Sequence, residues 1–331
     1  MIYSALRPLI FKLDPEQAHE LTMKVLSLAG HLPIQHLKPG LWKPRKVMGL
    51  EFDNPIGVAA GLDKEGVAVD GLGAMGFGHV EVGTVTPRAQ IGNPKPRLFR
   101  LPEHQAIINR MGFNNHGVDQ LLENLASSRY SGVTGINIGK NFDTPISKAV
   151  EDYLICFDKV ASRADYVTVN ISSPNTQNLR DLQHGDALRD LLSQLKDAQL
   201  AKAEYCPIAV KLAPDLSEAE LQQIVEIILQ CELDGVIATN TTLSRNQVEQ
   251  HQYGAEKGGL SGLPLKEVAA ARLDSIVKQV NGRIAVIAAG GVMEPEDVMQ
   301  RLDAGADLVQ IYTGLIYQGP GFPRKIFSHT H

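Results

Sequence analysis

Asparagines recur within or beside predicted β-strands, where this residue type contributes little to strand stability. Asn137, Asn170 and Asn240 lie within or at the end of short apolar runs that predict β-strands. Asn175 follows one of these runs, and Asn109 lies in the long segment between the second and third runs. Asparagine is depleted in strand interiors, and any one of these residues taken alone is best explained by a turn or a cap. Together they offer paired amide donors and acceptors, which suit the edges of a planar amide or imide ligand.

Two lysines and one serine add charge and a proton acceptor to this set. Lys64 follows the segment AAGLD (59–63), and Lys211 lies within the apolar run 208–213, where an unpaired ammonium is costly. A solvated surface lysine is the default interpretation, but Lys211 predicts an anionic partner such as a reduced cofactor ring or a carboxylate. Ser173 lies in NISSPNT (170–176) without a surrounding GxSxG turn, which argues against serine-hydrolase chemistry. Its alternative is a structural turn before proline.

Small residues follow the last two apolar runs, in the segments AAGGV (288–292) and YTG (312–314). Glycine allows the backbone to approach an anion closely, and free N–H groups bind phosphate. In a barrel of eight strands, the loops after strands 7 and 8 commonly hold a cofactor phosphate. The alternative is that these glycines only make tight turns.

Eight short apolar runs, each followed by a helical pattern, have to position these residues. Near-continuous apolar strands that alternate with helices indicate a parallel sheet covered on both faces. Eight units favour an α/β fold of the closed (β/α)8 TIM barrel type, and no GxGxxG turn follows the first run to support an open dinucleotide-binding sheet. Chemistry then belongs at the carboxyl ends of the strands. The predicted strands are 56–60, 79–85, 135–139, 166–172, 208–213, 235–240, 284–291 and 308–313.

The first 46 residues differ from the rest of the chain. The whole chain of 331 residues has a net charge of −5, but residues 1–46 carry seven cations and three anions, so the remainder has a net charge of −9. DPEQ (14–17) predicts the start of a helix that continues to about residue 29. Its apolar stripe (Ala18, Leu21, Val25 and Leu28) follows an apolar cluster at residues 6–11. Two interpretations stay open: a helical extension packed on the barrel, or a basic amphipathic pair on an anionic membrane surface.

Other function classes receive little support from the composition. The net negative charge of residues 47–331 argues against a nucleic-acid partner. Cys156, Cys206 and Cys231 have neither a zinc-site spacing nor a disulfide pattern, so no metal site is predicted. The longest stretch of apolar residues and glycines, 284–293, is shorter than the ~20 residues of a spanning helix.

Several motifs together resemble one family. AAGLDK (59–64), EVGTVT (81–86), NPKPRLFRLPEHQAIINRMGFNN (93–115), NISSPNT (170–176), IAVKLAPD (208–215), TNT (239–241) and AAGGV (288–292) are similar to those of class 2, quinone-dependent dihydroorotate dehydrogenase. The similarity runs in order from Asp14 to the region of Tyr312, nearly the whole chain. One departure follows Thr176, where the family usually has Pro-Gly and this chain has Gln177-Asn178, so the stiffness of the expected active-site lid is in question.

The resemblance implies an FMN-containing barrel that oxidises (S)-dihydroorotate to orotate in pyrimidine (UMP) biosynthesis and passes electrons to ubiquinone or menaquinone. Ser173 would remove the C5 proton while a hydride leaves C6 for the flavin N5, with Thr176 and Phe113 as candidates for a proton relay. The implied substrate residues are Lys64, Asn109, Arg110, Met111, Gly112, Phe113, Asn170, Asn175, Asn240 and Thr241. The implied FMN residues are Ala60, Gly61, Leu62, Asp63, Lys64, Thr84, Asn137, Asn170, Lys211, Thr239, Gly262, Gly291, Tyr312 and Thr313. Arg100 and Tyr312 are the quinone-site candidates.

The resemblance also implies a division of the chain. Residues 1–46 would be an amphipathic membrane and quinone-access segment, and residues 47–331 the FMN-binding catalytic barrel. The protein would then lie peripherally on the cytoplasmic face of the inner membrane, in contact with anionic lipid. The related soluble classes use cysteine where this chain has Ser173, which favours the quinone-linked class.

Three rival hypotheses remain at the level of sequence. The first is a soluble dihydroorotate dehydrogenase that uses fumarate or NAD, against which Ser173 and residues 1–46 count. The second is an RNA-directed flavin barrel, which would need a basic face and an RNA-binding domain. The third is a catalytically inactive barrel that serves as a binding scaffold, and its discriminating test is whether Ser173→Ala leaves cellular function intact.

Overall fold

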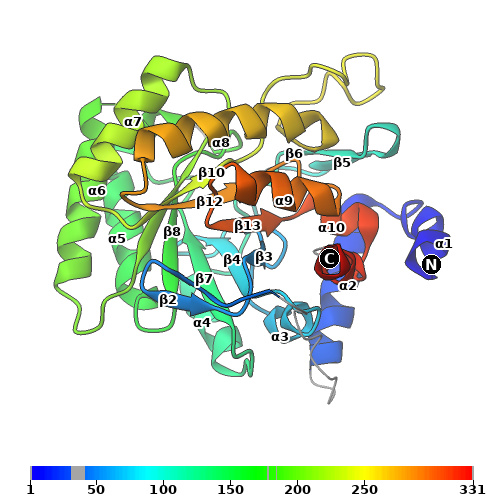
Figure 1. Cartoon of the computed structure of the whole chain (residues 1–331), viewed down its shortest axis with the longest axis horizontal. Helices are drawn as coiled ribbons and strands as arrows, with labels where there is room; N and C mark the ends of the chain where they lie inside the picture. The colour runs from blue at the N-terminus through cyan, green and yellow to red at the C-terminus, as the bar shows by residue number, and fades with distance from the viewer. Residues whose placement is uncertain (1, 31–41, 177–178, 184, 330–331) are drawn as a thin grey trace.

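Eight parallel strands close into a barrel in the computed structural model of the chain, which describes residues 2–30, 42–176, 179–183 and 185–329 (Figure 1). Around the barrel the strand order is β10-β12-β13-β3-β4-β7-β8-β9, so neighbours in sequence are mostly neighbours in space. The predicted (β/α)8 fold is confirmed, and each predicted run overlaps one barrel strand. These are β3 (Ile56–Val58), β4 (His79–Val85), β7 (Val133–Ile138), β8 (Tyr166–Asn170), β9 (Ile208–Leu212), β10 (Gly235–Ala238), β12 (Ala285–Ala289) and β13 (Leu308–Ile311).

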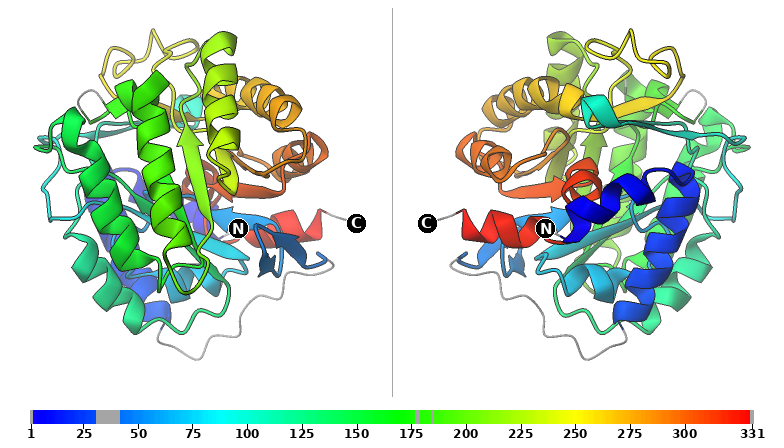
Figure 2. Two further views of the ribbon diagram at one scale, coloured as in Figure 1. Left: turned by 90° about the vertical axis from the view of Figure 1, so that its left-hand side faces the viewer. Right: turned by 90° about the vertical axis from the view of Figure 1, so that its right-hand side faces the viewer.

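Helices cover the outside of the barrel, so the strands are buried on both faces, as their apolar sequences require (Figure 2, left). A capping box begins α7, with the Ser217 hydroxyl accepting from the backbone N–H of Glu220. α9 begins at Pro295, and Glu294 and Asp297 form its capping box. The outer helices are α3 (Val69–Gly73), α4 (Val118–Ala126), α5 (Ala149–Val160), α6 (Gly185–Leu200), α7 (Glu218–Gln230), α8 (Lys266–Val280), α9 (Pro295–Asp303), α10 (Thr313–Gln318) and α11 (Phe322–Ser328).

Two small antiparallel sheets complete the barrel at its ends. The hairpin of β1 (Arg45–Val47) and β2 (Leu50–Phe52) covers the amino-terminal end, where the Phe52 ring meets the buried His79 ring at a centroid distance of 5.5 Å. A second sheet has the order β11-β6-β5 and consists of β5 (Leu98–Leu101), β6 (Ala106–Asn109) and β11 (Gly259–Gly262). It lies at the carboxyl ends of the barrel strands, where it contributes residues to the cavity described below.

The amino-terminal segment forms two helices, α1 (Ile2–Ile10) and α2 (Pro15–Gly30), of which α1 lies beside α10 (Figure 2, right). The carboxylate of Asp14 caps α2 by accepting from the backbone N–H groups of Glu16 and Gln17 at 3.0 and 3.1 Å. α2 packs closely on α3, because a Cβ at Gly71 would lie 2.3 Å from the carbonyl oxygen of Leu26. α1 is tied to α10 through the Tyr3 hydroxyl, which donates to the carbonyl of Ile316.

The face that α2 presents to the barrel differs from the predicted apolar stripe. Leu21, Val25 and Leu28 are 55, 55 and 70% exposed, whereas Glu16 is only 6% exposed. A helix whose stripe packed on the barrel would show the reverse pattern. Ala18 of the stripe is buried and α2 does pack on the barrel, but Leu21, Val25 and Leu28 do not cover it. None of the described helices is long and apolar enough to cross a membrane.

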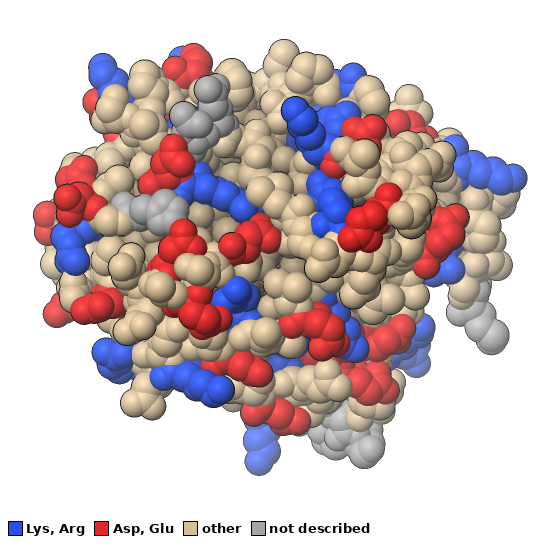
Figure 3. Space-filling view, turned by 90° about the horizontal axis from the view of Figure 1, so that it is seen from above, with Lys and Arg blue, Asp and Glu red and all other residues tan. Residues whose placement is uncertain are grey.

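Acidic and basic side chains are interspersed on the face seen from above (Figure 3). Among the described residues of this face, no continuous basic field is visible. A polyanion such as RNA needs such a field for binding. This face therefore offers no support for the RNA-directed rival.

Candidate active site

The predicted amides of β7 and β8 form a hydrogen-bonded cluster inside the barrel. The Asn170 side chain donates to the Thr84 hydroxyl at 2.9 Å and to the Asn137 side-chain oxygen at 3.2 Å. Asn137 in turn donates to the carboxylate of Glu81 at 2.9 Å and is fully buried. Asn137 thus lies beneath the cavity and orients Thr84 and Asn170, which face it.

The remaining amides come together from separate loops. Asn240, which follows β10, donates to the Ser172 hydroxyl at 2.9 Å and approaches the Asn170 oxygen at 3.4 Å. Asn175, which follows β8, donates to the Asn109 side-chain oxygen at 3.1 Å. Asn109 ends β6, so the β11-β6-β5 sheet (the accessory sheet) and the rim of the barrel meet at this pair.

Ser173 lies at the cavity and is only 5% exposed, and its hydroxyl accepts from the backbone N–H of Asn175 at 3.3 Å. Thr176, the predicted relay residue, is also buried, and its hydroxyl has no hydrogen-bond partner among the described residues. Phe113, the other relay candidate, lines the cavity. Gln177 and Asn178, which carry the departure from the family pattern, lie outside the described residues.

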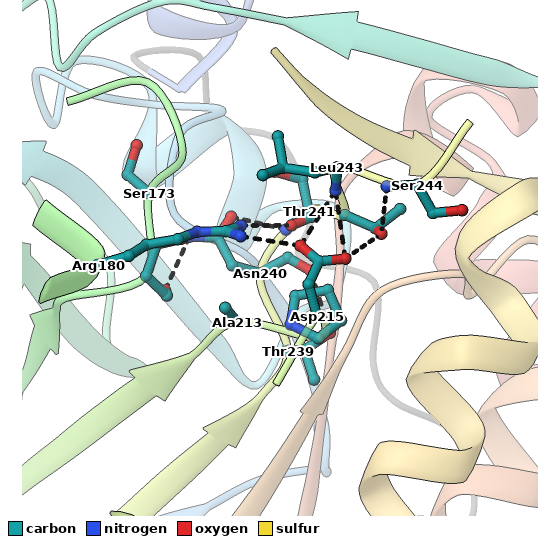
Figure 4. Close-up of polar contacts among 12 residues, drawn as sticks. Ser173, Arg180, Ala213, Asp215, Thr239, Asn240, Thr241, Leu243 and Ser244 are labelled. Carbon is teal, nitrogen blue, oxygen red and sulfur yellow. Dashed lines mark hydrogen bonds and ion pairs between the residues drawn. The ribbon is translucent and has the colours of Figure 1, made fainter. Parts of the chain in front are cut away.

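One arginine ties the Ser173 loop to the two loops that follow it in the barrel (Figure 4). The Arg180 guanidinium donates to the carbonyl of Ser172 at 3.1 Å, to the carboxylate of Asp215 at 2.9 Å and to the carbonyl of Thr241 at 3.4 Å. Asp215 also accepts from the hydroxyl of Thr242 and from the backbone N–H of Leu243. This network fixes the backbone directly before Ser173.

The two predicted lysines supply positive charge to the cavity. The Lys64 ammonium donates to the Asn114 side-chain oxygen at 2.6 Å. Burial and the nearby Arg97 guanidinium lower the pKa of Lys64 to about 7, against the opposing fields of Glu16 and Glu65. Lys211 is 6% exposed, and its ammonium forms no hydrogen bond or ion pair with any described residue. Burial lowers the pKa of Lys211, and the negative charge of Glu81 opposes this shift.

Glycine-rich loops close the other side of the cavity. Gly291 has φ of +70°, and a Cβ there would lie 2.2 Å from the Cα of Lys266. Gly262 has φ of +93°, and a Cβ there would lie 2.2 Å from the carbonyl oxygen of Gln105. Backbone conformation and packing therefore require these glycines whatever binds, so they do not discriminate between a phosphate site and a tight turn. The adjacent start of α10 offers backbone N–H groups that have no acceptor within the helix.

A single cavity joins most of the predicted residues, although they come from many separate strand ends and loops. Its other lining residues, which the sequence reasoning missed, include Leu98, Ile107 and Ser261 of the accessory sheet and Gln310 of β13. The predicted residues in the lining are Ala60, Gly61, Lys64, Thr84, Asn109, Met111, Gly112, Phe113, Asn170, Ser173, Asn175, Lys211, Thr239, Asn240, Thr241, Gly262, Gly291, Tyr312 and Thr313.

Other predicted residues lie outside this lining, each with a different partner. Asp63 accepts from the backbone N–H groups of Val67 and Ala68, which directly precede α3, and Leu62 packs in the core. Arg110 forms an ion pair with Glu256. Arg100 donates to the carbonyl of Phe11 at 2.9 Å and stacks over its ring, so it joins β5 to the amino-terminal segment rather than to the cavity.

The strongest signal that the sequence reasoning passed over is Glu81. It lies within an apolar strand, is fully buried, and accepts hydrogen bonds from the side chains of Asn137, Tyr166, Thr168 and Gln310. The argument that singled out Lys211, a charge inside an apolar strand, applies equally to Glu81. Arg180 and Asp215 carried no comparable signal, because polar residues are ordinary in loops.

Comparison with known proteins gives a consistent result. The family model described as dihydroorotate dehydrogenase matches residues 44–330. A protein from Chromobacterium violaceum, named dihydroorotate dehydrogenase (quinone), is 55% identical over 326 residues, which are 97% of this chain and 95% of that protein. One of the same name from Acinetobacter baylyi is 54% identical over 99% of both chains. Among solved structures, DHODH from Eimeria tenella in complex with ferulenol has a TM-score of 0.89 at 38% identity, over 95% of this chain and 90% of that one.

Proposed function

Because the chain belongs to the dihydroorotate dehydrogenase family, we propose that it oxidises (S)-dihydroorotate to orotate and passes the electrons through FMN to a membrane quinone. The observation that carries this proposal is the buried Lys211 side chain, which lines the cavity and forms no ion pair with any described residue. A buried ammonium without an ion-pair partner is costly, so the site favours an anionic ligand. The rest of the lining supplies amides for a planar ring.

The donor set of the cavity fits a flavin mononucleotide. Lys211, Thr84 and Asn170 lie together at the carboxyl ends of neighbouring strands, where they would hold the ring, with Lys211 opposite its anionic part. Gly291 and the start of α10 at Thr313 would hold the phosphate. When bound, FMN supplies the acceptor for the hydride that leaves C6 of dihydroorotate. Phosphate at this place agrees with the common position of cofactor phosphates in such barrels.

The opposite side of the cavity would hold the substrate. Lys64 would bind the carboxylate, and Asn109, Asn175 and Asn240 would bind the polar edges of the pyrimidine ring. Ser173 lies among these residues and would take the proton from C5. A serine hydroxyl is a weak base, so its own proton has to leave, and the buried, unpartnered Thr176 hydroxyl would accept it, with water near Phe113.

The test of the reaction begins with the flavin spectrum of the purified protein. We expect dihydroorotate to bleach it without oxygen, and a ubiquinone analogue to restore it. In Ser173→Ala, bleaching should slow by ~10²–10⁴-fold, the usual contribution of a general base, while orotate still binds. Wild-type protein that is not bleached would refute the proposed reaction, and a variant bleached at the normal rate would assign the base to another residue.

Quinone as acceptor has its own test. A panel of ubiquinone, menaquinone, fumarate and NAD distinguishes the quinone-linked reaction from the soluble rivals. Arg100 and Tyr312 are the proposed quinone residues, and they lie at different depths. Tyr312 is in the cavity lining, and Arg100 is at the junction with the amino-terminal segment. Turnover only with fumarate or NAD would overturn this part of the proposal.

The amino-terminal helices are proposed to hold the protein peripherally on the cytoplasmic face of the inner membrane. The exposed leucines and valine of α1, α2 and the turn between them support this, since large apolar side chains cluster there (Leu6, Leu9, Leu13, Leu21, Val25 and Leu28). We expect sedimentation with anionic vesicles and loss of it in the double variant Leu21→Ser/Leu28→Ser. Arg189→Ser, which alters an exposed residue of α6, serves as control. Equal sedimentation of all three proteins would contradict lipid binding through these helices.

A further inference from the structure

A buried ion pair joins α2 to the loop before β5. The Arg97 guanidinium meets the Glu16 carboxylate through its Nε at 3.2 Å and through Nη2 at 2.7 Å. Both residues are almost fully buried, at 7 and 6% exposure. Lys95 adds a further contact with Glu16 at 3.3 Å. Burial acts to raise the pKa of Glu16, but Arg97 and Lys95 outweigh it and hold this pKa below its usual value.

This pair is not explained by helix packing alone. α2 turns Glu16 inward while it leaves Leu21 and Leu28 exposed, although burying leucine is favourable and burying a carboxylate is costly. A buried ion pair offers little net stability over apolar packing. We therefore ask what the Glu16–Arg97 pair positions, because a two-point contact to a carboxylate fixes both the position and the orientation of the guanidinium.

Arg97 uses its remaining donors on the segment that precedes it. Its Nη1 donates to the carbonyls of Ile91 and Asn93 at 2.5 and 2.9 Å. The chain winds closely around this group, since a Cβ at Gly92 would lie 2.9 Å from the same nitrogen. The conformation of residues 91–97 therefore depends on where Arg97 is held, and Glu16 holds it.

Asn93 carries this arrangement into the proposed substrate site. Its side-chain nitrogen donates to the carbonyl of Arg110 at 2.9 Å and to the carbonyl of Asn175 at 3.1 Å. Its backbone N–H donates to the carbonyl of Met111 at 3.0 Å, and a Cβ at Gly112 would lie 2.8 Å from its side-chain nitrogen. Met111, Gly112 and Asn175 all line the cavity.

We propose that Glu16 is a positioning residue for the pyrimidine substrate: α2, through Arg97 and Asn93, holds Asn175 and the 111–112 segment in the geometry that binds the ring. The amino-terminal segment is then part of the substrate site and not only a contact to lipid and quinone. The proposal rests on the proposed function in one respect, that the ligand of the Asn175 side of the cavity is dihydroorotate or orotate.

The test measures orotate binding to the full-length, FMN-loaded protein through the change in flavin absorbance, a reaction in which neither quinone nor lipid takes part. Glu16→Gln should weaken orotate binding about tenfold, the effect of one lost amide hydrogen bond. Flavin reduction at saturating dihydroorotate should change less than orotate binding, because Arg180 anchors the backbone directly before Ser173 independently of Glu16. Glu20→Gln is the matched control, since Glu20 lies on the same helix near the same Lys95 but is exposed.

A double-mutant cycle separates positioning from general destabilisation. Asn93→Ala should weaken orotate binding as Glu16→Gln does, and the combination should cost little more than either change alone, because both break the same chain of contacts. Full additivity of the two effects, or normal orotate binding by Glu16→Gln, would overturn the proposal. If Glu16→Gln loses its flavin, Glu16→Asp decides instead: it keeps the charge but shortens the reach, and we expect weakened binding there too. Failure of the wild-type protein to bind orotate would refute the proposed function and not this coupling.

Discussion

Substrate affinity should depend on pH through Lys64, the proposed partner of the substrate carboxylate. The pKa of this lysine is lowered to about 7, so its ammonium is lost just above neutral pH in the ligand-free site. Only the protonated form attracts a carboxylate, and a bound carboxylate in turn keeps the ammonium charged. The affinity therefore falls as pH rises through the pKa of the free site. From about pH 6 to about pH 8.5 the protonated fraction falls, and the orotate Kd rises, about thirtyfold.

The assay is titration of the flavin absorbance with orotate at a series of pH values. Lys64→Arg is the matched control, because a guanidinium stays charged throughout this range; its Kd should be flat. Lys64→Met should bind weakly at every pH. Glu16→Gln should move the decline to lower pH, since the Glu16 charge acts to raise the pKa of Lys64. A constant wild-type Kd, or the same decline in Lys64→Arg, would refute the assignment of this titration to Lys64.

Two further predictions concern residues outside the lining. Arg180→Met should slow flavin reduction at saturating dihydroorotate by about 10–100-fold, because the backbone at Ser172 loses its anchor. Arg189→Met, on the exposed side of α6, is the control and should reduce its flavin at the wild-type rate. Equal rates in the two variants would refute the anchoring role. His79 is fully buried with its pKa lowered to about 3, so the unfolded chain gains a proton below about pH 6.5 that the folded barrel refuses. The free energy of unfolding should therefore be ~2 kcal/mol lower at pH 5 than at neutral pH. Urea unfolding of His79→Leu should show a correspondingly smaller loss of stability between these pH values, and the same loss as in the wild-type protein would contradict this assignment.

The barrel was predictable from the sequence because its signals are local. An apolar strand, a capping box such as Ser217 with Glu220, and a helix each depend on residues within a few positions of one another. The amides at strand ends followed from the same signals, since the fold brings the carboxyl ends of all barrel strands to one side.

The contacts that fix side-chain orientation were not predictable in this way. Arg97 lies 81 positions from Glu16, and Arg180 lies 35 positions from Asp215. No periodicity links such pairs. The stripe on α2 shows the same limit, because the pattern indicated an apolar face but not which surface that face would meet. Only the tertiary structure shows that Arg97 turns Glu16 inward and leaves Leu21 and Leu28 outside.

Lys211 and Glu81 show how far the argument from a buried charge extends. The position of Lys211 inside an apolar strand predicted an anion nearby, and the Glu81 carboxylate lies inside the same barrel. Yet Glu81 accepts hydrogen bonds from Asn137, Tyr166, Thr168 and Gln310, and it forms no ion pair with Lys211. Its carboxylate is satisfied by neutral donors, so its field supports the lysine charge without occupying the ammonium. The donors of Lys211 thus stay directed to the cavity, and the requirement for an anionic ligand at that place, met by a flavin in the proposed reaction, persists after the whole fold is known.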